Sequence, residues 1–522
     1  MQNQKRENLL NLALSATDEE RERSENLDVG YDPEERTWEL IVRHSGSLAG
    51  LAGAGIQVDE LLNGYAVLVV PEHLVDQVSE LNQIEYIEKP KRLFFASNMA
   101  RAASCLSVVQ SPSGTGNVTG GVISGLSGGL TGRGVLVAVI DSGIDYLNQD
   151  FRNEDGSTRI LMLMDQDRGR IYTREEINEA LDAPDRAGAL DLVPSVDLSG
   201  HGTAVAAIAA GNGRGSQGVY RGVAYESDLL VVKLGAPLAD NFPRTTQLMK
   251  GLDFVIRQAQ ELGRPVAVNL SFGNTYGSHD GTSLLETFMN DISNYGRSVL
   301  VAGTGNEGTG NGHTAGRLVM GSDTDVELSI APFETGMGVQ LWKSYVDAFA
   351  IRLITPSGGS IGPIDSRLGP QTLNYGGTRI LIYYGKPSPY SKAQEVYFDF
   401  IPIRDYLDSG IWTFRLTPER IVTGQYDMWL PSRGILNPST RFLMPVPETT
   451  LTIPSTAANV ISVGAYDDSY QSYADFSGRG FTRQTQQVKP DLVAPGVDIV
   501  TARSGGGYGI LASQCIKLIY NG

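Results

Sequence analysis

The chain has 522 residues and a formal net charge of −17, so it is long enough for two to four domains, each with its own core. The acidic balance argues against nucleic acid as a partner, and no apolar run approaches the ~20 residues of a membrane span. Two cysteines, Cys105 and Cys515, exclude a disulfide framework, and the five histidines show no spacing typical of metal ligands.

The first 35 residues are rich in charge and are predicted to form a loosely ordered N-terminal segment. Within residues 1–35, an apolar run at residues 9–16 follows two basic residues and faintly resembles a signal peptide. The run is short, is interrupted by Asn11, and is followed by the charged residues 17–23. We therefore expect no signal peptide.

Residues 36–96 are predicted to form a compact α+β unit. Two apolar, β-branched runs at residues 38–42 and 66–70 are typical of strands. Residues 71–81 carry apolar side chains with helical spacing, and residues 84–88 are predicted to add another strand. Taken alone, this pattern is typical of a small ferredoxin-like domain.

An α/β domain with a parallel sheet and helices on both faces is predicted over residues 97–311 and 450–522. Its clearest strands are the apolar runs at residues 137–140 and 299–302, which lead into Gly-rich turns and are typical of buried parallel strands. An Ala-rich helix is predicted at residues 204–211. Catalytic groups of such domains collect at the carboxyl ends of the strands, where the two turns begin.

The stretch 312–449 interrupts that pattern and is predicted to be an inserted β-sandwich or jelly roll. It contains short β-rich runs that are separated by Gly, Pro and Ser turns, a spacing typical of antiparallel sheets. The clearest of these runs are residues 348–354, 379–384, 395–400 and 410–416.

Three polar residues stand in Gly-rich motifs of the α/β domain. Asp141 precedes Ser-Gly after the first strand, His201 lies in Gly-His-Gly-Thr, and Asn306 lies in Gly-Asn-Glu-Gly. Each motif alone is more often a turn or a capped helix start than a catalytic site. In this order, and followed by the Lys-Pro-Asp-Leu-Val-Ala-Pro-Gly block at residues 489–496, they resemble the subtilisin-like serine proteases (subtilases).

The resemblance implies a peptidase that acts by an Asp-His-Ser mechanism. Asp141 would orient the imidazole of His201, which would act as general base and then as general acid, and Asn306 would donate its amide to the oxyanion. Two edge strands, residues 232–235 and 268–273, would hold an extended peptide by strand addition. The residues expected to contact that peptide are Leu234, Gly235, Ser271, Phe272, Gly273 and Gly303.

The segment in which the family carries its serine departs from the family pattern. Counted from residues 494–496, the nucleophile position falls on Cys515, without the small residues that should precede it or the Ala and Pro that should follow. Ser513 is a neighbour of that position and not a substitute. We therefore expect the serine segment to be missing from the chain as written, through a shifted reading frame or in a genuine pseudoprotease.

A Gly-Thr-Ser string does occur at residues 281–283, but no Ala or Pro follows at the required spacing. It also precedes Asn306, which is the wrong place in the order of the family. Thr282 or Ser283 is instead predicted to cap a helix that begins at Leu284.

Three functions are compatible with the sequence. The first is a subtilisin-like serine endopeptidase, and the second is an inactive pseudoprotease that binds a peptide or a partner. A third, weaker interpretation is an enzyme that uses Cys515 as its nucleophile. A fluorophosphonate probe separates the first two, because only an activated serine reacts with it.

The sandwich insert and the unit at residues 36–96 together resemble the clostridial spore-germination (Csp-like) proteases. The resemblance implies that residues 36–96 are a propeptide, which serves as folding template and inhibitor, with self-cleavage near residues 94–97. The implied partners are a polypeptide substrate or partner zymogen and the chain's own propeptide. No cofactor is expected; the resemblance leaves calcium open, since it is common in the family, but no carboxylate cluster identifies a site here. A cytoplasmic or spore-associated location is favoured over secretion.

Overall fold

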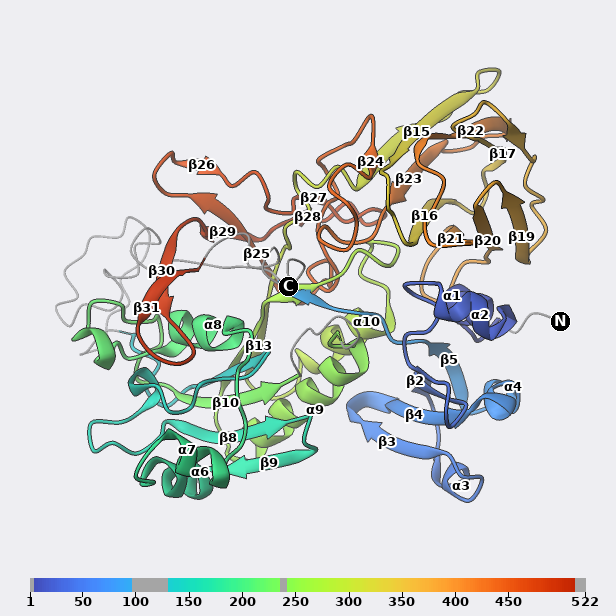
Figure 1. Cartoon of the computed structure of the whole chain (residues 1–522). Coiled ribbons are helices and arrows are strands. Elements are labelled where there is room, and N and C mark those ends of the chain that lie inside the picture. The colour runs from blue at the N-terminus through green and yellow to red at the C-terminus, as the bar shows by residue number, and fades with distance from the viewer. Residues whose placement is uncertain (1–3, 96–129, 235–241, 512–522) are drawn as a thin grey trace.

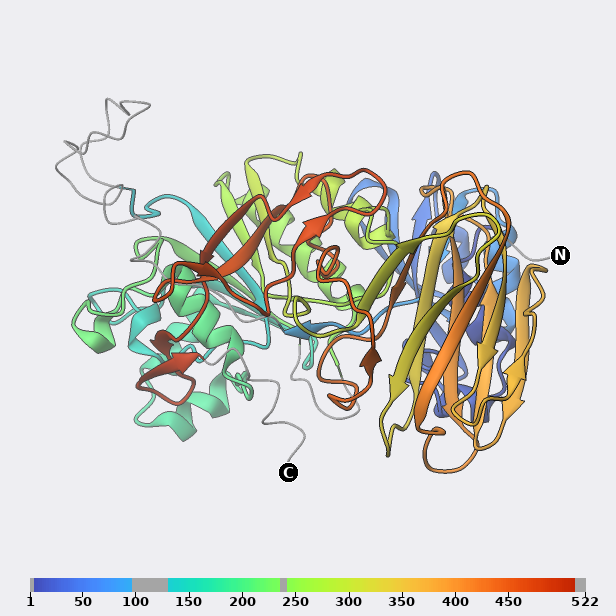
Figure 2. The same ribbon diagram turned by 90° about the horizontal axis from the view of Figure 1, so that it is seen from above.

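The structure is a computed structural model, and it describes residues 4–95, 130–234 and 242–511. Figure 1 shows an N-terminal unit and a β-sandwich that lie one above the other beside a larger α/β core. Seen from above, the long strands of the sandwich stand at one side of that core (Figure 2). No helix among these residues is long and apolar enough to cross a membrane.

The N-terminal unit is built on an antiparallel sheet, whose apolar strands were predicted from their β-branched composition. The strand order is β1 (Tyr31–Asp32), β2 (Thr37–His44), β4 (Tyr65–Pro71), β3 (Gln57–Leu61), and β5 (Ile84–Glu88) pairs with β2. The predicted helix is present but shorter, as α4 (Val75–Glu80), and a further short helix is α3 (Ala49–Ala52).

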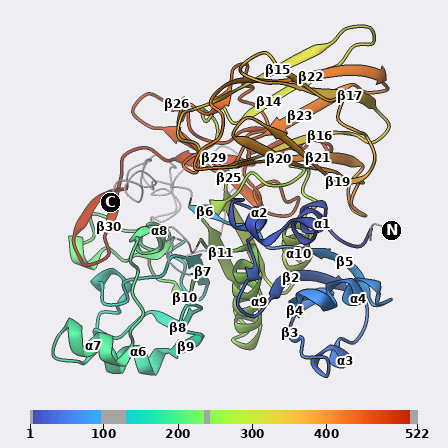
Figure 3. The same cartoon turned by 45° about the vertical axis from the view of Figure 1, so that its right-hand side comes forward.

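The prediction of a loosely ordered segment over residues 1–35 is wrong for the part that the structure describes. Helices α1 (Asn8–Ser15) and α2 (Asp18–Glu22) form there. The apolar run that resembled a signal peptide has helical spacing, so its leucines share one face, and that face is buried. Figure 3 shows both helices between the N-terminal sheet and strands β19–β21 of the sandwich, whose bounds follow below.

The α/β core has a predominantly parallel sheet, as predicted from its doubly buried apolar strands. The order is β26 (Ser472–Tyr473), β25 (Ile461–Asp467), β13 (Ser298–Gly303), β11 (Val266–Leu270), β7 (Leu136–Asp141), β10 (Asp228–Lys233), β8 (Ile160–Asp165), β9 (Arg170–Thr173), and β29 (Leu492–Pro495) pairs with β25. Helices cover both faces, so the predicted α/β class is confirmed.

Two sets of helices cover the two faces of this sheet. Helices α9 (Thr245–Glu261) and α10 (Leu284–Ile292) pack on one face, and α8 (His201–Ala210) packs on the other. The remaining elements of the core are α6 (Arg174–Leu181), α7 (Arg186–Leu192), β12 (Phe272–Gly273), β27 (Gly480–Phe481), β28 (Val488–Lys489), β30 (Ile499–Ala502) and β31 (Tyr508–Leu511).

The inserted segment is an antiparallel sandwich with its own apolar core, as predicted. One sheet has the order β14 (His313–Arg317), β23 (Gln425–Trp429), β16 (Met337–Ser344), β21 (Ala393–Pro402), β20 (Thr378–Tyr384), β19 (Gly369–Tyr375). The other has the order β18 (Ser360–Ile361), β17 (Ala348–Ile354), β22 (Gly410–Arg420), β15 (Thr324–Ile330), β24 (Arg441–Phe442).

The N-terminal unit and the sandwich share one hydrophobic cluster. Leu10 of α1 and Trp38 of β2 belong to the same cluster as Leu381, Tyr383 and Tyr397 of the sandwich. Burial of such side chains contributes roughly 1.5–3 kcal/mol each, so the two units stabilise one another. Tyr65 of β4 belongs to a second cluster, together with Phe288 of α10, so the N-terminal unit packs against the core as well as the sandwich.

Candidate active site

Asp141 and His201 come together at the carboxyl edge of the parallel sheet. Asp141 is the last residue of β7, and His201 is the first residue of α8. The distance from Asp141 Oδ1 to His201 Nδ1 is 2.7 Å, and both side chains are buried. This contact fixes the orientation of the imidazole ring, which is the first requirement of a base that is to act through its other nitrogen.

Glycines beside His201 permit this close approach. Gly200 has a φ of +74°, a backbone conformation that favours glycine. A Cβ on Gly202 would lie 2.2 Å from the carbonyl oxygen of Gly143, so no larger residue fits there. The Gly-His-Gly motif therefore reflects the narrow gap between the start of α8 and the turn after β7.

Asn306 follows β13 on the same edge of the sheet. The parallel ladders end with Leu270 opposite both Ala302 and Ile140, so the residues that follow, Ser271, Gly303 and Asp141, lie at the same edge of the sheet. Asn306 Oδ1 is buried without a hydrogen-bond partner among the described residues. The structure thus brings all three predicted polar residues to one edge, which was expected from their positions after parallel strands.

The predicted peptide-binding strand β12 is already occupied. Strand β6 (Phe94–Phe95), the tail of the N-terminal unit, pairs with it antiparallel, with Phe95 opposite Phe272 and Phe94 opposite Gly273. Figure 3 shows β6 reaching from the N-terminal unit into the core. An extended segment is therefore held by strand addition, and the residues after Phe95 lie outside the described part of the chain.

The second predicted edge strand is not an edge. Residues 228–233 form β10, which lies inside the sheet between β7 and β8, and Leu234 N donates to Asp141 O at 2.8 Å. The other side of the tail is instead flanked by residues 243–245, where Leu93 N donates to Pro243 O at 2.7 Å.

The composition of a strand does not reveal whether it lies at an edge of such a sheet. Strand β11 (residues 266–270) is likewise interior, and β12 beyond it offers the edge to which the tail adds. Interior strands and cleft strands of such a sheet are equally apolar, so composition does not distinguish them. Gly235 lies outside the described residues.

The Gly-Thr-Ser string is a helix start, as predicted. Ser283 is the N-cap of α10, and its hydroxyl and the Glu286 side chain form a reciprocal capping box. Segment 512–522, with Ser513 and Cys515, lies outside the described residues. Among the described residues, no group of three or more His, Cys, Asp or Glu side chains could hold a metal ion.

Comparison with known proteins places this geometry in a family. Residues 132–328 and 445–517 match the subtilase family, and residues 4–91 match the Csp protease B prodomain. The chain belongs to the subtilase family. The match of residues 4–91 shows that the N-terminal unit of this subtilase is a prodomain, and that the prodomain includes α1 and α2.

Solved structures agree with this assignment. The structure of the Clostridium perfringens CspB protease is 34% identical, with a TM-score of 0.71, over 80% of this chain and 82% of that one. An S41 psychrophilic protease and sphericase are 17% and 14% identical, each with a TM-score of 0.36. Each match covers 74% of this chain and 74% of the other protein. These last two similarities are too distant to add to the argument.

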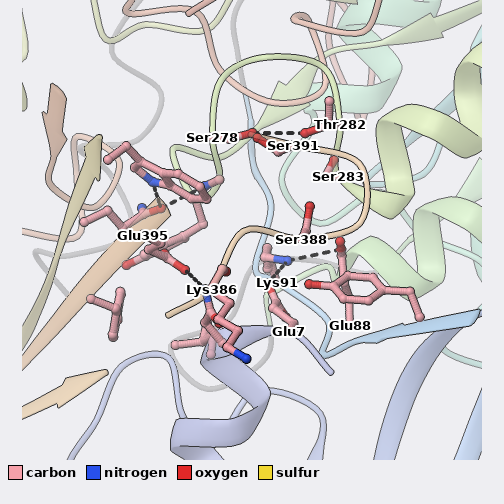
Figure 4. A pocket seen from close by; sticks show the side chains of 18 residues that line it. Glu7, Glu88, Lys91, Ser278, Thr282, Ser283, Lys386, Ser388, Ser391 and Glu395 are labelled. Carbon is pink, nitrogen blue, oxygen red and sulfur yellow. Dashed lines mark hydrogen bonds and ion pairs between the residues drawn. The ribbon is translucent and has the colours of Figure 1, made fainter. Parts of the chain in front are cut away.

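Buried charges line the junction at which prodomain, core and sandwich meet. A polar cavity of about 60 Å³ lies there (Figure 4). Lys91 Nζ contacts Glu7 Oε1 at 2.7 Å and Glu88 Oε2 at 3.4 Å, and Glu395 of the sandwich accepts a hydrogen bond from Asn8 at 3.3 Å. Burial raises the pKa of Glu395 and that of Glu88 from about 4.5 to about 7.

Glu88 and Glu395 each predict a contribution to stability that is lost as the pH rises. Between about pH 4.5 and pH 7 these two groups keep protons in the folded protein that they have released in the unfolded chain, so their contribution to the free energy of unfolding falls as the pH rises and is lost above about pH 7. Urea unfolding measures the free energy of unfolding at pH 5 and at pH 8. The decrease in this free energy from pH 5 to pH 8 is expected to be smaller for Glu395→Gln than for the wild type. Glu419 is exposed, and Glu419→Gln is the control. An equal decrease in the free energy of unfolding in all three proteins would contradict this prediction.

Proposed function

We propose that this subtilase is a serine endopeptidase in which Asp141 orients His201 and His201 serves as general base. The observation that carries the proposal is the buried 2.7 Å contact between the Asp141 carboxylate and His201 Nδ1. In the mechanism, His201 takes the proton of the serine nucleophile as it attacks the scissile carbonyl, and then gives it to the leaving amine. Asn306 donates a hydrogen bond from its side-chain amide to the oxyanion, and such a donor lowers the barrier by roughly 2.7–4 kcal/mol.

In the subtilase pattern the position of the nucleophile lies in the segment after Leu511, where it falls on Cys515 and not on a serine. Hairpin β30–β31 leads into this segment and packs against α8, where Thr501 Oγ1 donates to Ala204 O at 3.0 Å. This arrangement delivers the chain to the side of the sheet on which His201 lies. Residues 512–522 contain Ser513 and Cys515, neither of which stands in a Gly-Thr-Ser motif, so the identity of the nucleophile is the part of the proposal that covalent labelling tests.

The prodomain tail is proposed to be both inhibitor and first substrate. Because Phe95 pairs with Phe272, the next residue, Ala96, is expected opposite Ser271. Ser271 and Asp141 follow residues that pair in the parallel ladder of β11 and β7, so both lie at the same edge of the sheet. The peptide bond that follows Ala96 is therefore proposed as the site of self-cleavage, and polypeptides that enter the same groove, including a partner zymogen, are the proposed substrates.

Thr452 is proposed to restrict the residue before the scissile bond to a small side chain. A Cβ on Gly273 would come 2.5 Å from Thr452 Oγ1, and a Cβ on Gly305 would come 2.4 Å from Thr452 Cγ2. Paired residues of two strands share a face, and the face repeats every second residue. The Thr452 side chain thus lies on the face of Phe94, and a tail that continued as an extended strand would bring the residue two positions later, Ala96, to the same face.

Thr452→Gly is expected to enlarge this space and to shift selectivity toward larger residues. Peptides Leu-Phe-Phe-X with a fluorogenic leaving group should show a rise of about 10- to 100-fold in the ratio of kcat/KM for X = Leu over X = Ala. Thr450→Gly removes a buried threonine from the same segment and is the matched control. An unchanged ratio in Thr452→Gly would remove Thr452 from the account of specificity.

N-terminal sequencing and intact mass of the purified protein test the proposed function. A peptidase yields a chain that begins at Ser97 together with a separate prodomain. The second candidate function is that of a pseudoprotease that binds a peptide or partner. It is favoured by the pairing of β6 with β12, since strand pairing uses backbone hydrogen bonds and needs no nucleophile. It predicts an uncut chain that still binds a Leu-Phe-Phe-Ala peptide once the tail is displaced.

A further inference from the structure

A second buried carboxylate, Asp197, lies beside the Asp141–His201 pair. It precedes His201 by four residues, and it is 2% exposed. Its two oxygens accept hydrogen bonds from both segments that carry the pair, as the following contacts show. No sequence motif singled it out.

Asp197 holds the start of helix α8. Thr203, in the first turn of the helix, donates both its backbone N–H and its hydroxyl to Asp197 Oδ2, at 2.8 and 2.6 Å. Gly200 N donates to Asp197 Oδ1 at 2.9 Å, and Ser199 Oγ donates to the same oxygen at 3.3 Å. Because the N-cap residue Gly200 has no side chain, the first N–H groups of α8 depend on such an external acceptor.

Asp197 also holds the turn that follows Asp141. Ser142 Oγ donates to Asp197 Oδ1 at 2.8 Å and accepts a hydrogen bond from Gly202 N at 2.9 Å. Ser142 N donates to Asp141 Oδ1 at 2.7 Å, and this is the oxygen that contacts His201 Nδ1. One carboxylate therefore ties the turn of the aspartate to the helix of the histidine.

We propose that Asp197 is a positioning residue that sets the distance and angle between the Asp141 carboxylate and the His201 imidazole. It acts through Ser142 on one side and through the first turn of α8 on the other. The inference rests on the proposed function for its catalytic consequence, although the geometric consequence does not depend on catalysis. A displacement of about 1 Å in such a pair lowers a reaction rate by about 10²-fold.

Asp197→Asn is the variant that tests this role. It keeps the size of the side chain, but its amide offers one acceptor oxygen where the carboxylate offered two, so the donors of Thr203 and Ser142 compete for it. The readout is the deshielded proton NMR resonance of His201 Nδ1–H hydrogen-bonded to Asp141, in full-length protein labelled with ¹⁵N-histidine. Loss or displacement of that resonance is expected in Asp197→Asn, together with a decrease of about 10- to 100-fold in the rate of fluorophosphonate labelling.

The control is Glu286→Gln. Glu286 is also a buried carboxylate in the first turn of a helix, α10, where it bonds Ser283 and Thr456. Glu286→Gln should lower the free energy of unfolding and leave the His201 resonance and the labelling rate unchanged. If Asp197→Asn behaves as Glu286→Gln does, Asp197 is a structural cap alone and the proposal is overturned.

The outcomes separate this inference from the proposed function. A wild-type protein that shows the resonance but takes no label contradicts the proposed peptidase activity. The positioning role is then tested by the position of the resonance in Asp197→Asn compared with the wild type. If Asp197→Asn does not fold, Ser142→Ala is the second variant: it leaves the contacts between Asp197 and α8 in place and removes the Ser142 hydroxyl, which bonds both Asp197 and Gly202 N. It should then displace the same resonance, and an unmoved resonance in folded Ser142→Ala overturns the proposal.

Discussion

Asp141→Asn is expected to lower the rate of fluorophosphonate labelling by about 10⁴-fold. The carboxylate of Asp141 accepts a hydrogen bond from His201 Nδ1–H at 2.7 Å and stabilises the imidazolium that forms when His201 takes a proton. An amide at this place carries no charge, and it favours the wrong tautomer of the ring. His201→Ala removes the base itself and is expected to have an effect at least as large.

Asp150→Asn is the matched control for this prediction. Asp150 is equally buried, and it accepts hydrogen bonds from Gly215 N and from the hydroxyl of Tyr508 rather than from His201. Asp150→Asn should therefore lose stability and keep its labelling rate when it is assayed well below its unfolding midpoint. Equal labelling rates of Asp141→Asn and the wild type would exclude Asp141 from the mechanism.

Lys91→Met is expected to lower the free energy of unfolding by about 3–5 kcal/mol. Lys91 is buried at the junction between the prodomain, the core and the sandwich, and it pairs with both Glu7 and Glu88. Although burial alone lowers the pKa of Lys91, the two carboxylates raise that pKa above its ordinary value. Methionine fills the space of the lysine but leaves both carboxylates without a cation, and equilibrium unfolding in urea measures the loss.

Lys250→Met provides the comparison. Lys250 of α9 pairs with Asp59 of the prodomain, so it also bridges the prodomain and the core, but both partners are partly exposed. Surface pairs of this kind contribute about 0–1 kcal/mol. Combining Lys91→Met with Glu7→Gln and Glu88→Gln should recover most of the stability, because the unpaired charges are then gone. A similar loss in the free energy of unfolding for Lys91→Met and Lys250→Met would show that the Lys91 ion pairs stabilise the protein no more than a surface pair does.

The sequence predicted the parts of the site that depend on local spacing. Asp141, His201 and Asn306 each follow a strand or open a helix, and parallel strands align their carboxyl ends, so the residues were expected on one edge of the sheet. The antiparallel sandwich followed in the same way from short apolar runs between turn residues. A helix cap at Thr282 or Ser283 was predicted from the polar residues that precede the run beginning at Leu284, and the structure has Ser283 as the N-cap.

Features that depend on long-range contacts were not predicted. The order of strands decides which one borders the peptide groove, so β10 was wrongly taken as an edge. Helix α1 has a clear apolar face, but it forms a stable element only because the prodomain sheet and the sandwich bury that face. Asp197 and Thr452 were missed because their importance comes from neighbours that are distant in the chain, Ser142 and Gly273 respectively.

Fluorophosphonate labelling of the purified protein, followed by mass spectrometry of the labelled peptide, tests the central claim most directly. A peptidase predicts a single adduct after Leu511, where the sequence holds one serine, Ser513, two residues before the position at which the family carries its nucleophile, and it predicts no adduct in His201→Ala. An unlabelled wild type that remains folded would contradict the claim of a peptidase. The protein would then be a subtilase-fold protein that binds its own tail, or a partner, at β12.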